Sequence, residues 1–185
     1  NKDYQGLFGV VSEDALIKDL VLEGKVQGKH YVGALAGRLN GVVSNIIIKD
    51  MAVTGHDYVG LLAGDSQITE LLNISLKGVV EGLSYVGGMI GHSQTITANV
   101  TYFMGSIYAS GNYVGGLIGY IETESILTNV FSSGVIHASE SNYVGGLFGH
   151  FKGSLENAYA TTSITANSYA AGIAAIHEGE MNEIF

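Results

Sequence analysis

The chain has 185 residues, 46% of them hydrophobic, so it is long enough to bury a core, and its formal net charge is −9. Only 8 residues are Lys or Arg, which leaves little to neutralise phosphates or anionic lipid headgroups and argues against binding to nucleic acids and membrane surfaces. Cysteine is absent, which excludes disulfide bonds and thiolate metal sites, and no stretch has the roughly 20 consecutive apolar residues of a membrane span.

Proline is absent as well, although the chain holds 27 glycines. A continuously hydrogen-bonded β-ladder excludes proline, which has no backbone donor, and accepts glycine at sharp corners. The composition therefore favours a chain whose backbone is almost entirely paired in strands.

A heptapeptide that begins with Tyr-Val recurs along the chain. An incomplete copy lies near Asp3 to Gly9, and a degenerate copy, YAAGIAA, covers residues 169–175. The complete copies are YVGALAG (31–37), YVGLLAG (58–64), YVGGMIG (85–91), YVGGLIG (113–119) and YVGGLFG (143–149). From residue 31 to residue 169, the tyrosines are 27, 27, 28, 30 and 26 residues apart. A nearly fixed period of this size is typical of stacked repeats, because one unit cannot bury its apolar face without a neighbour.

Between successive heptapeptides lies a second pattern, an Asn or Asp followed by alternating apolar residues. It begins at Asp19, Asn45, Asn73, Asn99, Asn129 and Asn157. Alternation with period two over short segments rich in β-branched residues indicates strands with one buried face. Glycines or small polar residues recur about every five residues, which leaves too little room for a helix between the strands.

Both periodicities are satisfied by an all-β fold, the parallel β-helix or β-solenoid. Each coil of about 27 residues would contribute two or three short strands that pair with the coils above and below. We expect six to seven coils in a single domain over residues 1–185, wound right-handed as most parallel crossovers are. Because the chain opens inside one heptapeptide and stops just after Asn182, we expect it to be a fragment of a longer array.

The heptapeptide ends in Gly-Leu-hydrophobic-Gly, and this ending is intact at Gly6–Gly9, Gly116–Gly119 and Gly146–Gly149. In this feature it resembles the GLUG motif of bacterial surface proteins, which occurs in adhesins and in the non-catalytic regions of secreted immunoglobulin A metallopeptidases. The departures from the motif are Met89 in place of leucine and the glycine positions occupied by Ala34, Leu61 and Ala175. The resemblance covers essentially the whole chain. It implies a β-solenoid at the bacterial cell surface or in the extracellular space, and it assigns no ligand, cofactor or catalytic residue.

One candidate binding surface is the column formed by the first residue of each heptapeptide. Its members are Tyr31, Tyr58, Tyr85, Tyr113, Tyr143 and Tyr169. These aromatic rings could stack against the sugar rings of a glycan, or they could pack on one another and cover a corner. We expect packing to be their main role, because every coil carries the residue whatever its neighbours are, and we keep ligand contact as the alternative.

The Asn column and the histidines are not expected to bind metal. Amides are poor ligands alone, and stacked Asn side chains hydrogen-bond along a rod, so the column predicts an asparagine ladder at inward-turning corners. The residues that follow the heptapeptides include His92 and His150, which are two coils apart and too far from each other to share a zinc ion. The remaining histidines, at 30, 56, 137 and 177, occupy scattered positions, and all six are expected at exposed corners.

No catalytic or cofactor-binding site is predicted either. His177-Glu178 lacks the second histidine of a zinc-protease motif, since position 181 is Met. A polysaccharide lyase or hydrolase would need converging acids with a basic partner. The densest acids, at 122, 124, 140 and 156, have no such partner.

Three functions fit this interpretation. We favour a non-catalytic structural and binding module, such as a segment of an adhesin-like stalk or fibre, with a host glycan, a protein or further copies of itself end to end as partners. The first alternative is an ancillary region that positions substrate for a secreted zinc metallopeptidase. The second is a carbohydrate-active enzyme built on a β-helix.

Overall fold

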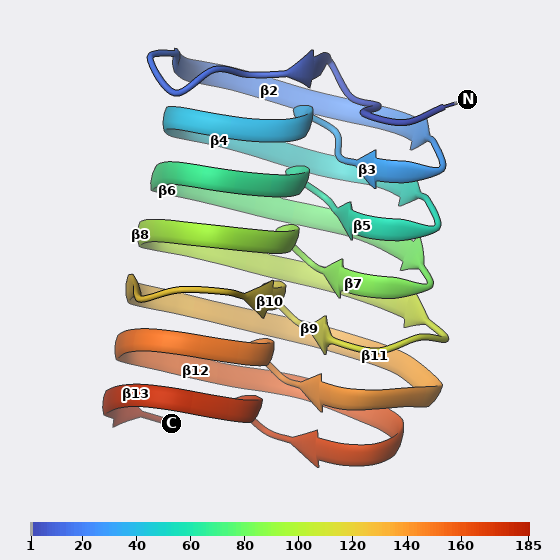
Figure 1. Ribbon diagram of the computed structural model, residues 1–185, viewed down its shortest axis with the longest axis vertical. Coiled ribbons are helices and arrows are strands. Elements are labelled where there is room, and N and C mark those ends of the chain that lie inside the picture. Colours follow the sequence, from blue (N-terminus) through green and yellow to red (C-terminus); the bar gives the residue numbers. More distant parts are fainter. Residues whose placement is uncertain (1) are drawn as a thin grey trace.

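The computed structural model describes residues 2–185, and it confirms the parallel β-solenoid (Figure 1). The chain forms about 7 turns of about 27 residues each. Residues 2–185 contain no helix, and hence none that is long and apolar enough to cross a membrane. In Figure 1 the chain runs from right to left along the near side and returns from left to right along the far side as it descends, so the winding is right-handed.

The strands form one sheet in which every pairing is parallel. They are β1 (Phe8–Val10), β2 (Leu16–Gln27), β3 (His30–Val32), β4 (Ala36–Thr54), β5 (Asp57–Gly60), β6 (Ala63–Gly82), β7 (Ser84–Gly87), β8 (Ile90–Ala109), β9 (Val114–Gly115), β10 (Ile118–Ile121), β11 (Ser125–Gly145), β12 (Phe148–Ala171) and β13 (Ala174–Ile184).

Many strands are longer than the two or three short strands per coil that the sequence predicts, and β12 reaches 24 residues. The reason is that the chain turns corners inside a strand. Asn45 in β4 and Asn73 in β6, for example, adopt φ angles of 55° and 57°. A single residue in this left-handed conformation, which Asn tolerates better than most residues, bends the strand while the ladder continues on both sides.

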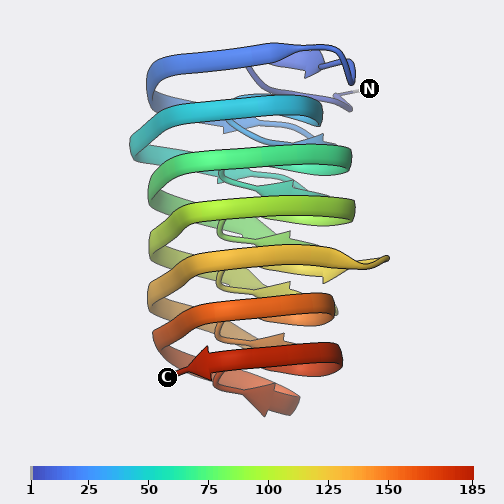
Figure 2. The ribbon, with the colours of Figure 1, turned by 90° about the vertical axis from the view of Figure 1, so that its left-hand side faces the viewer.

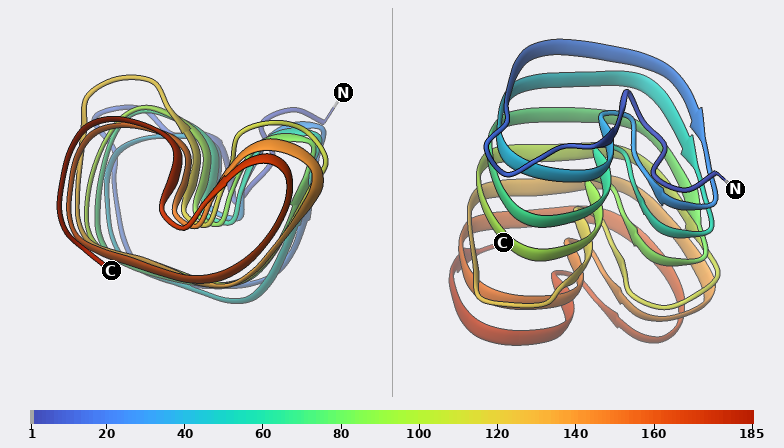
Figure 3. Two further views of the ribbon diagram at one scale, coloured as in Figure 1. Left: turned by 90° about the horizontal axis from the view of Figure 1, so that it is seen from below. Right: turned by 45° about the horizontal axis from the view of Figure 1, so that its top comes forward.

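The coils stack in register, and the side view in Figure 2 shows them one above another. Residues 122–124, which connect β10 to β11, reach beyond the neighbouring coils in this view. Seen along the rod in Figure 3, the coils share an outline with a deep indentation between two lobes.

The heptapeptides form this indentation, because each one runs inward and out again. The last glycine of a heptapeptide lies against the backbone of the first residues of the previous one. At Gly64, for example, an added Cβ would overlap backbone atoms of Tyr31 and Val32. A glycine is therefore needed where the two walls of the indentation touch.

The core lies between these walls and the outer strands. The valine column and the column at the fifth heptapeptide position are fully buried from the coil of Val32 to the coil of Val144. Burial contributes on the order of 1.5 to 3 kcal/mol for each such aliphatic side chain. The fourth heptapeptide position varies with the space opposite it: Leu61 is fully buried, whereas a Cβ at Gly88 would overlap the ring of Phe103.

The asparagine ladder is confirmed in part, and it lies on the outside. It is interrupted between Asn73 and Asn99, because strand register places Val100 rather than Asn99 at the corner position of that coil. Asn45 Nδ2 donates to Asp19 Oδ1 (2.9 Å) and Asn73 Nδ2 to Asn45 Oδ1 (3.2 Å). Further along the rod, Asn129 donates to Asn99 in the same way, and Asn157 to Asn129. All six side chains are exposed, so the expectation of inward-turning corners was wrong. A left-handed backbone turns all of these residues except Asn99 outward, since Val100 is the left-handed residue of that coil, and their remaining hydrogen-bonding groups are open to solvent.

Candidate binding groove

One wall at the mouth of the indentation is a continuous ladder of tyrosine rings. Neighbouring rings are stacked face to face, with centroids 4.6 to 5.4 Å apart and interplanar angles of 5° to 21°. The ladder consists of Tyr4, Tyr31, Tyr58, Tyr85, Tyr113, Tyr143 and Tyr169. Parallel pairing produces this arrangement, since it places the same residue of successive coils one strand spacing apart, near 4.8 Å.

Every tyrosine of the ladder has a left-handed backbone, with φ between 48° and 61°. This conformation is costly for a large side chain, so the stacking must outweigh the strain at each coil. The ring faces cover one another along the rod. A ligand in the groove would therefore meet ring edges and hydroxyl groups, and only the outward faces of Tyr4 and Tyr169 have no ring of this ladder on them.

The residue that follows each heptapeptide forms the opposite wall. Strand register places these residues in one column: Val10, Arg38, Asp65, His92, Tyr120, His150 and Ile176. Several of them contact the tyrosine ladder across the groove. Arg38 Cζ lies 5.4 Å from the centroid of the Tyr4 ring, and the rings of His92 and Tyr58 are nearly perpendicular, with centroids 5.8 Å apart.

Arg38, Asp65 and His92 form a charged cluster in this wall. Arg38 Nε donates to Asp65 Oδ2 at 2.7 Å, and His92 Nδ1 lies 2.8 Å from Asp65 Oδ1. Asp65 is only 5% exposed. On the solvent side, His92 Nε2 lies 3.9 Å from Glu122 Oε2. Both oxygens of the buried carboxylate thus have partners in neighbouring coils.

The pKa of Asp65 reflects this pairing. Burial alone would raise it, but the hydrogen bonds from His92 and Arg38, together with their charges, lower it below the ordinary value for aspartate. Across the groove, burial and then the neighbouring phenols and acids raise the pKa of Tyr58, and burial raises that of Tyr113 in the same way. The carboxylate therefore stays ionised near neutral pH, while these phenols stay protonated.

The groove around this cluster is small and polar. It has a volume of about 200 Å³, and the exposed side chains of Gln67 and Gln94 line it together with Arg38, His92 and Glu122. Amides, a guanidinium group and phenolic hydroxyls can donate and accept several hydrogen bonds. Such a set suits a ligand rich in hydroxyl groups.

The predicted tyrosine column is confirmed as one wall of the groove, and three of the histidines lie elsewhere than expected. The six predicted tyrosines lie together in one wall, and Tyr4 joins them. It was missed because its heptapeptide is incomplete, although Gly6–Gly9 marks the copy. His92 is partly buried, and His150 is buried within the groove wall, where its Nδ1 lies 3.0 Å from the carbonyl oxygen of Ile121. The expectation that all six histidines lie at exposed corners was therefore wrong for these two, because strand register carries them into the stacked wall, and for His30, which is partly buried in β3.

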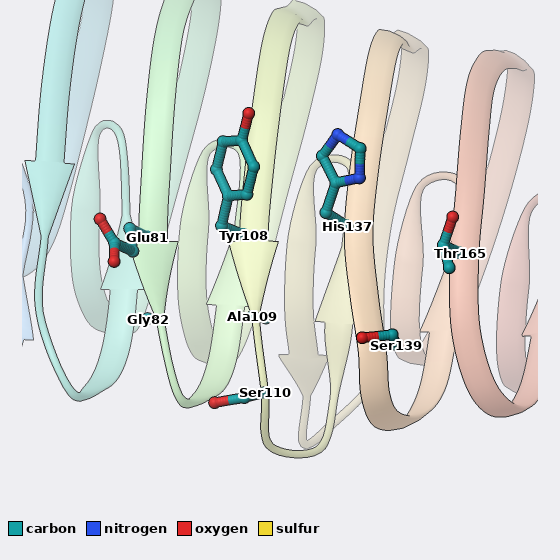
Figure 4. Close-up of a pocket in the computed structure, with 8 residues that line it drawn as sticks. All are labelled: Glu81, Gly82, Tyr108, Ala109, Ser110, His137, Ser139 and Thr165. Atoms are coloured by element: carbon teal, nitrogen blue, oxygen red, sulfur yellow. The ribbon is translucent and has the colours of Figure 1, made fainter.

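A second hollow lies on the strands that lead into the heptapeptides, and it shares no lining residue with the groove. Figure 4 shows the side chains of Glu81, Tyr108, His137 and Thr165 in a row across successive coils. The rings of Tyr108 and His137 stack with centroids 5.0 Å apart, and the hollow has a volume of about 390 Å³. Its side chains form no cluster of acids or nucleophiles.

The fold and the groove define the chain as a repeat protein of the β-solenoid class. No protein family, curated protein or solved structure matches the chain.

Proposed function

We propose that the chain is a non-catalytic structural and binding module of a bacterial cell-surface or secreted protein, in which a rigid solenoid carries a ligand-binding groove. The observation that carries this proposal is the uninterrupted tyrosine ladder from Tyr4 to Tyr169, which forms one wall along the whole rod. A ladder repeats the same surface at every coil, so it suits a long ligand better than a small one.

The pairing of charges supports a non-catalytic role. A glycoside hydrolase needs one carboxyl group with a raised pKa as its general acid and a second carboxylate beside it. In the groove, the pKa of Asp65 is lowered, and both of its oxygens bind basic groups. Glu122, on the exposed rim, has no second free carboxylate among the residues that line the groove. The lining around the Arg38–Asp65–His92 cluster therefore offers no such pair of carboxyl groups, which favours a non-catalytic role for this part of the groove.

The ligand we propose is a neutral glycan chain. Its hydroxyl groups would pair with Gln67, Gln94 and Arg38 on one side and with tyrosine hydroxyls on the other. Because the net charge is −9, long-range repulsion disfavours polyanionic glycans.

The test is binding of the whole chain to an array of neutral and acidic glycans. The groove variant Gln67→Ala/Gln94→Ala removes two exposed side chains, and the control Thr161→Ala/Thr165→Ala removes two exposed side chains outside the groove. We expect the groove variant to bind a neutral glycan about 10- to 30-fold more weakly than the wild type, because two hydrogen bonds of about 1 kcal/mol each are lost. The control should bind like the wild type. Equal binding by both variants, or release of reducing ends from any glycan, would contradict the proposal.

A further inference from the structure

Three metal-ligating side chains from two neighbouring coils converge at the corner just before the tyrosine wall. His30 in β3 and Asp57 in β5 are paired partners in adjacent coils, and His56 directly precedes Asp57. His30 Nδ1 lies 3.3 Å from Asp57 Oδ2, and His56 Nδ1 lies 3.0 Å from the same oxygen. One ligand atom of each residue lies within 4.8 Å of those of the other two.

The two nitrogen–oxygen separations are similar to those within a metal coordination shell. In a tetrahedral zinc site with bonds near 2.1 Å, neighbouring ligand atoms are about 3.4 Å apart. The two nitrogen–oxygen separations lie close to this value, and the two histidine nitrogens lie within 4.8 Å of each other, so an ion could be bound once side-chain rotation brings these nitrogens closer together.

The backbone holds the three residues in place. The N–H of His56 donates to the carbonyl oxygen of Lys29 in the preceding coil (2.7 Å), and its own carbonyl oxygen accepts from the N–H of Leu83 in the following coil (2.6 Å). His30 and Asp57 are fixed one strand spacing apart by the parallel ladder. The corner is therefore ordered by three coils before any ion binds.

We propose that His30, His56 and Asp57 bind a divalent transition-metal ion of the kind that imidazole favours, such as Zn²⁺ or Cu²⁺. The side chains are 26%, 54% and 25% exposed, respectively, so a further coordination position faces solvent and can be filled by water. The ion would link two adjacent coils. This site is separate from the Arg38–Asp65–His92 cluster and does not depend on the glycan-binding proposal.

The test is calorimetric titration of the whole chain with Zn²⁺, Cu²⁺ and, as a hard cation that imidazole does not favour, Mg²⁺. We expect one equivalent of Zn²⁺ or Cu²⁺ to bind and no binding of Mg²⁺. The variant His30→Gln/His56→Gln should lose this equivalent. The matched control His137→Gln/His177→Gln, which replaces two exposed histidines elsewhere, should keep it.

Thermal unfolding gives a second measurement. Zn²⁺ that binds the folded chain should raise the Tm of the wild type and of the control but not that of His30→Gln/His56→Gln. Because His56 is half exposed, His56→Gln alone can replace the double variant if the latter does not fold, and it should weaken binding. The proposal is overturned if the wild type binds no stoichiometric ion, or if the His30→Gln/His56→Gln variant, or His56→Gln in its place, binds the ion as tightly as the wild type does.

Discussion

A missing side chain at the fourth heptapeptide position allows neighbouring coils to approach. At Gly116 a Cβ would overlap the carbonyl oxygen of Gly146 and the side chain of Ser132, whereas the equivalent Gly172 has no atom within 4 Å of an added Cβ. We therefore expect Gly116→Ala to lower the free energy of unfolding by about 1–3 kcal/mol through overpacking. Gly172→Ala should change it by less than about 0.5 kcal/mol. Urea unfolding of the two variants measures both values, and equal effects would contradict this account.

Asp65 makes a pH-dependent contribution to stability. Its pKa is lower in the folded chain, so the contribution is complete above the unfolded-chain value of about 3.9 and is lost as the pH falls through the folded value. We expect Asp65→Asn to cost about 3 kcal/mol at neutral pH, because Arg38 and His92 lose their shared partner. The difference from the wild type should narrow below about pH 4. Urea unfolding at several pH values tests this, and a difference that stays constant down to about pH 3 would show that the Asp65 carboxylate does not cause it.

At the scale of the element, the tyrosine ladder balances backbone strain against stacking. A left-handed residue other than glycine costs roughly 1–2 kcal/mol, and a stacked aromatic pair contributes about 0.5–1.5 kcal/mol beyond burial. Tyr85 has a φ of 55° and stacks on both Tyr58 (4.8 Å) and Tyr113 (5.4 Å). Two stacked neighbours and the buried part of the ring can therefore offset the strain.

This balance predicts an unusual order of variants at Tyr85. Tyr85→Ala keeps the strain and loses both stacked pairs, so it should cost about 3 kcal/mol. Tyr85→Gly should be about 1 kcal/mol less destabilising than Tyr85→Ala, because glycine adopts the left-handed conformation freely. Tyr85→Phe should be nearly neutral, because the described residues show no hydrogen bond to the Tyr85 hydroxyl. Thermal unfolding of the three proteins gives the order, and an alanine variant more stable than the glycine variant would refute the role of strain.

The fold could be predicted from the sequence because the repeat of about 27 residues sets both the position of the strands and the alignment of the buried side chains in columns. Val32 and Val59 fall in the same column as soon as the repeat is recognised, and the structure pairs them. The inward path of the heptapeptide could not be predicted. It depends on contact between two backbones, at Gly64 and Val32, that are more than one coil apart in sequence.

The His30–His56–Asp57 cluster was missed for a different reason. The prediction placed the histidines at scattered positions, although His30 and Asp57 both stand immediately before a heptapeptide tyrosine and are paired in the structure. His56 lies one position earlier, so a column analysis separates it from His30, although the corner turns both side chains towards Asp57. Alignment of the repeats identifies contacts between equivalent residues of successive coils. It does not identify contacts between residues at different repeat positions that a bend in the chain brings together.

At the scale of the whole molecule, both ends of the rod expose surface that coils in the middle bury. The first coil exposes Leu7 and Val10, and the last coil exposes Tyr169, which is 64% accessible. Ala170 occupies the column of Val144 but has no coil beneath it and is exposed. Unpaired strand edges with apolar neighbours are templates for further pairing.

We therefore predict that this chain associates end to end, the last coil of one copy resting on the first coil of the next. Ala170→Lys would place a charge in the core column at the joint and should shift the chain towards the monomer. Thr165→Lys adds the same charge to an exposed outer position of the last coil and should leave association unchanged. Sedimentation velocity over a range of concentrations measures the oligomer distribution. A wild-type chain that stays monomeric at high concentration, or equal association by the two lysine variants, would show that the ends do not pair through this column.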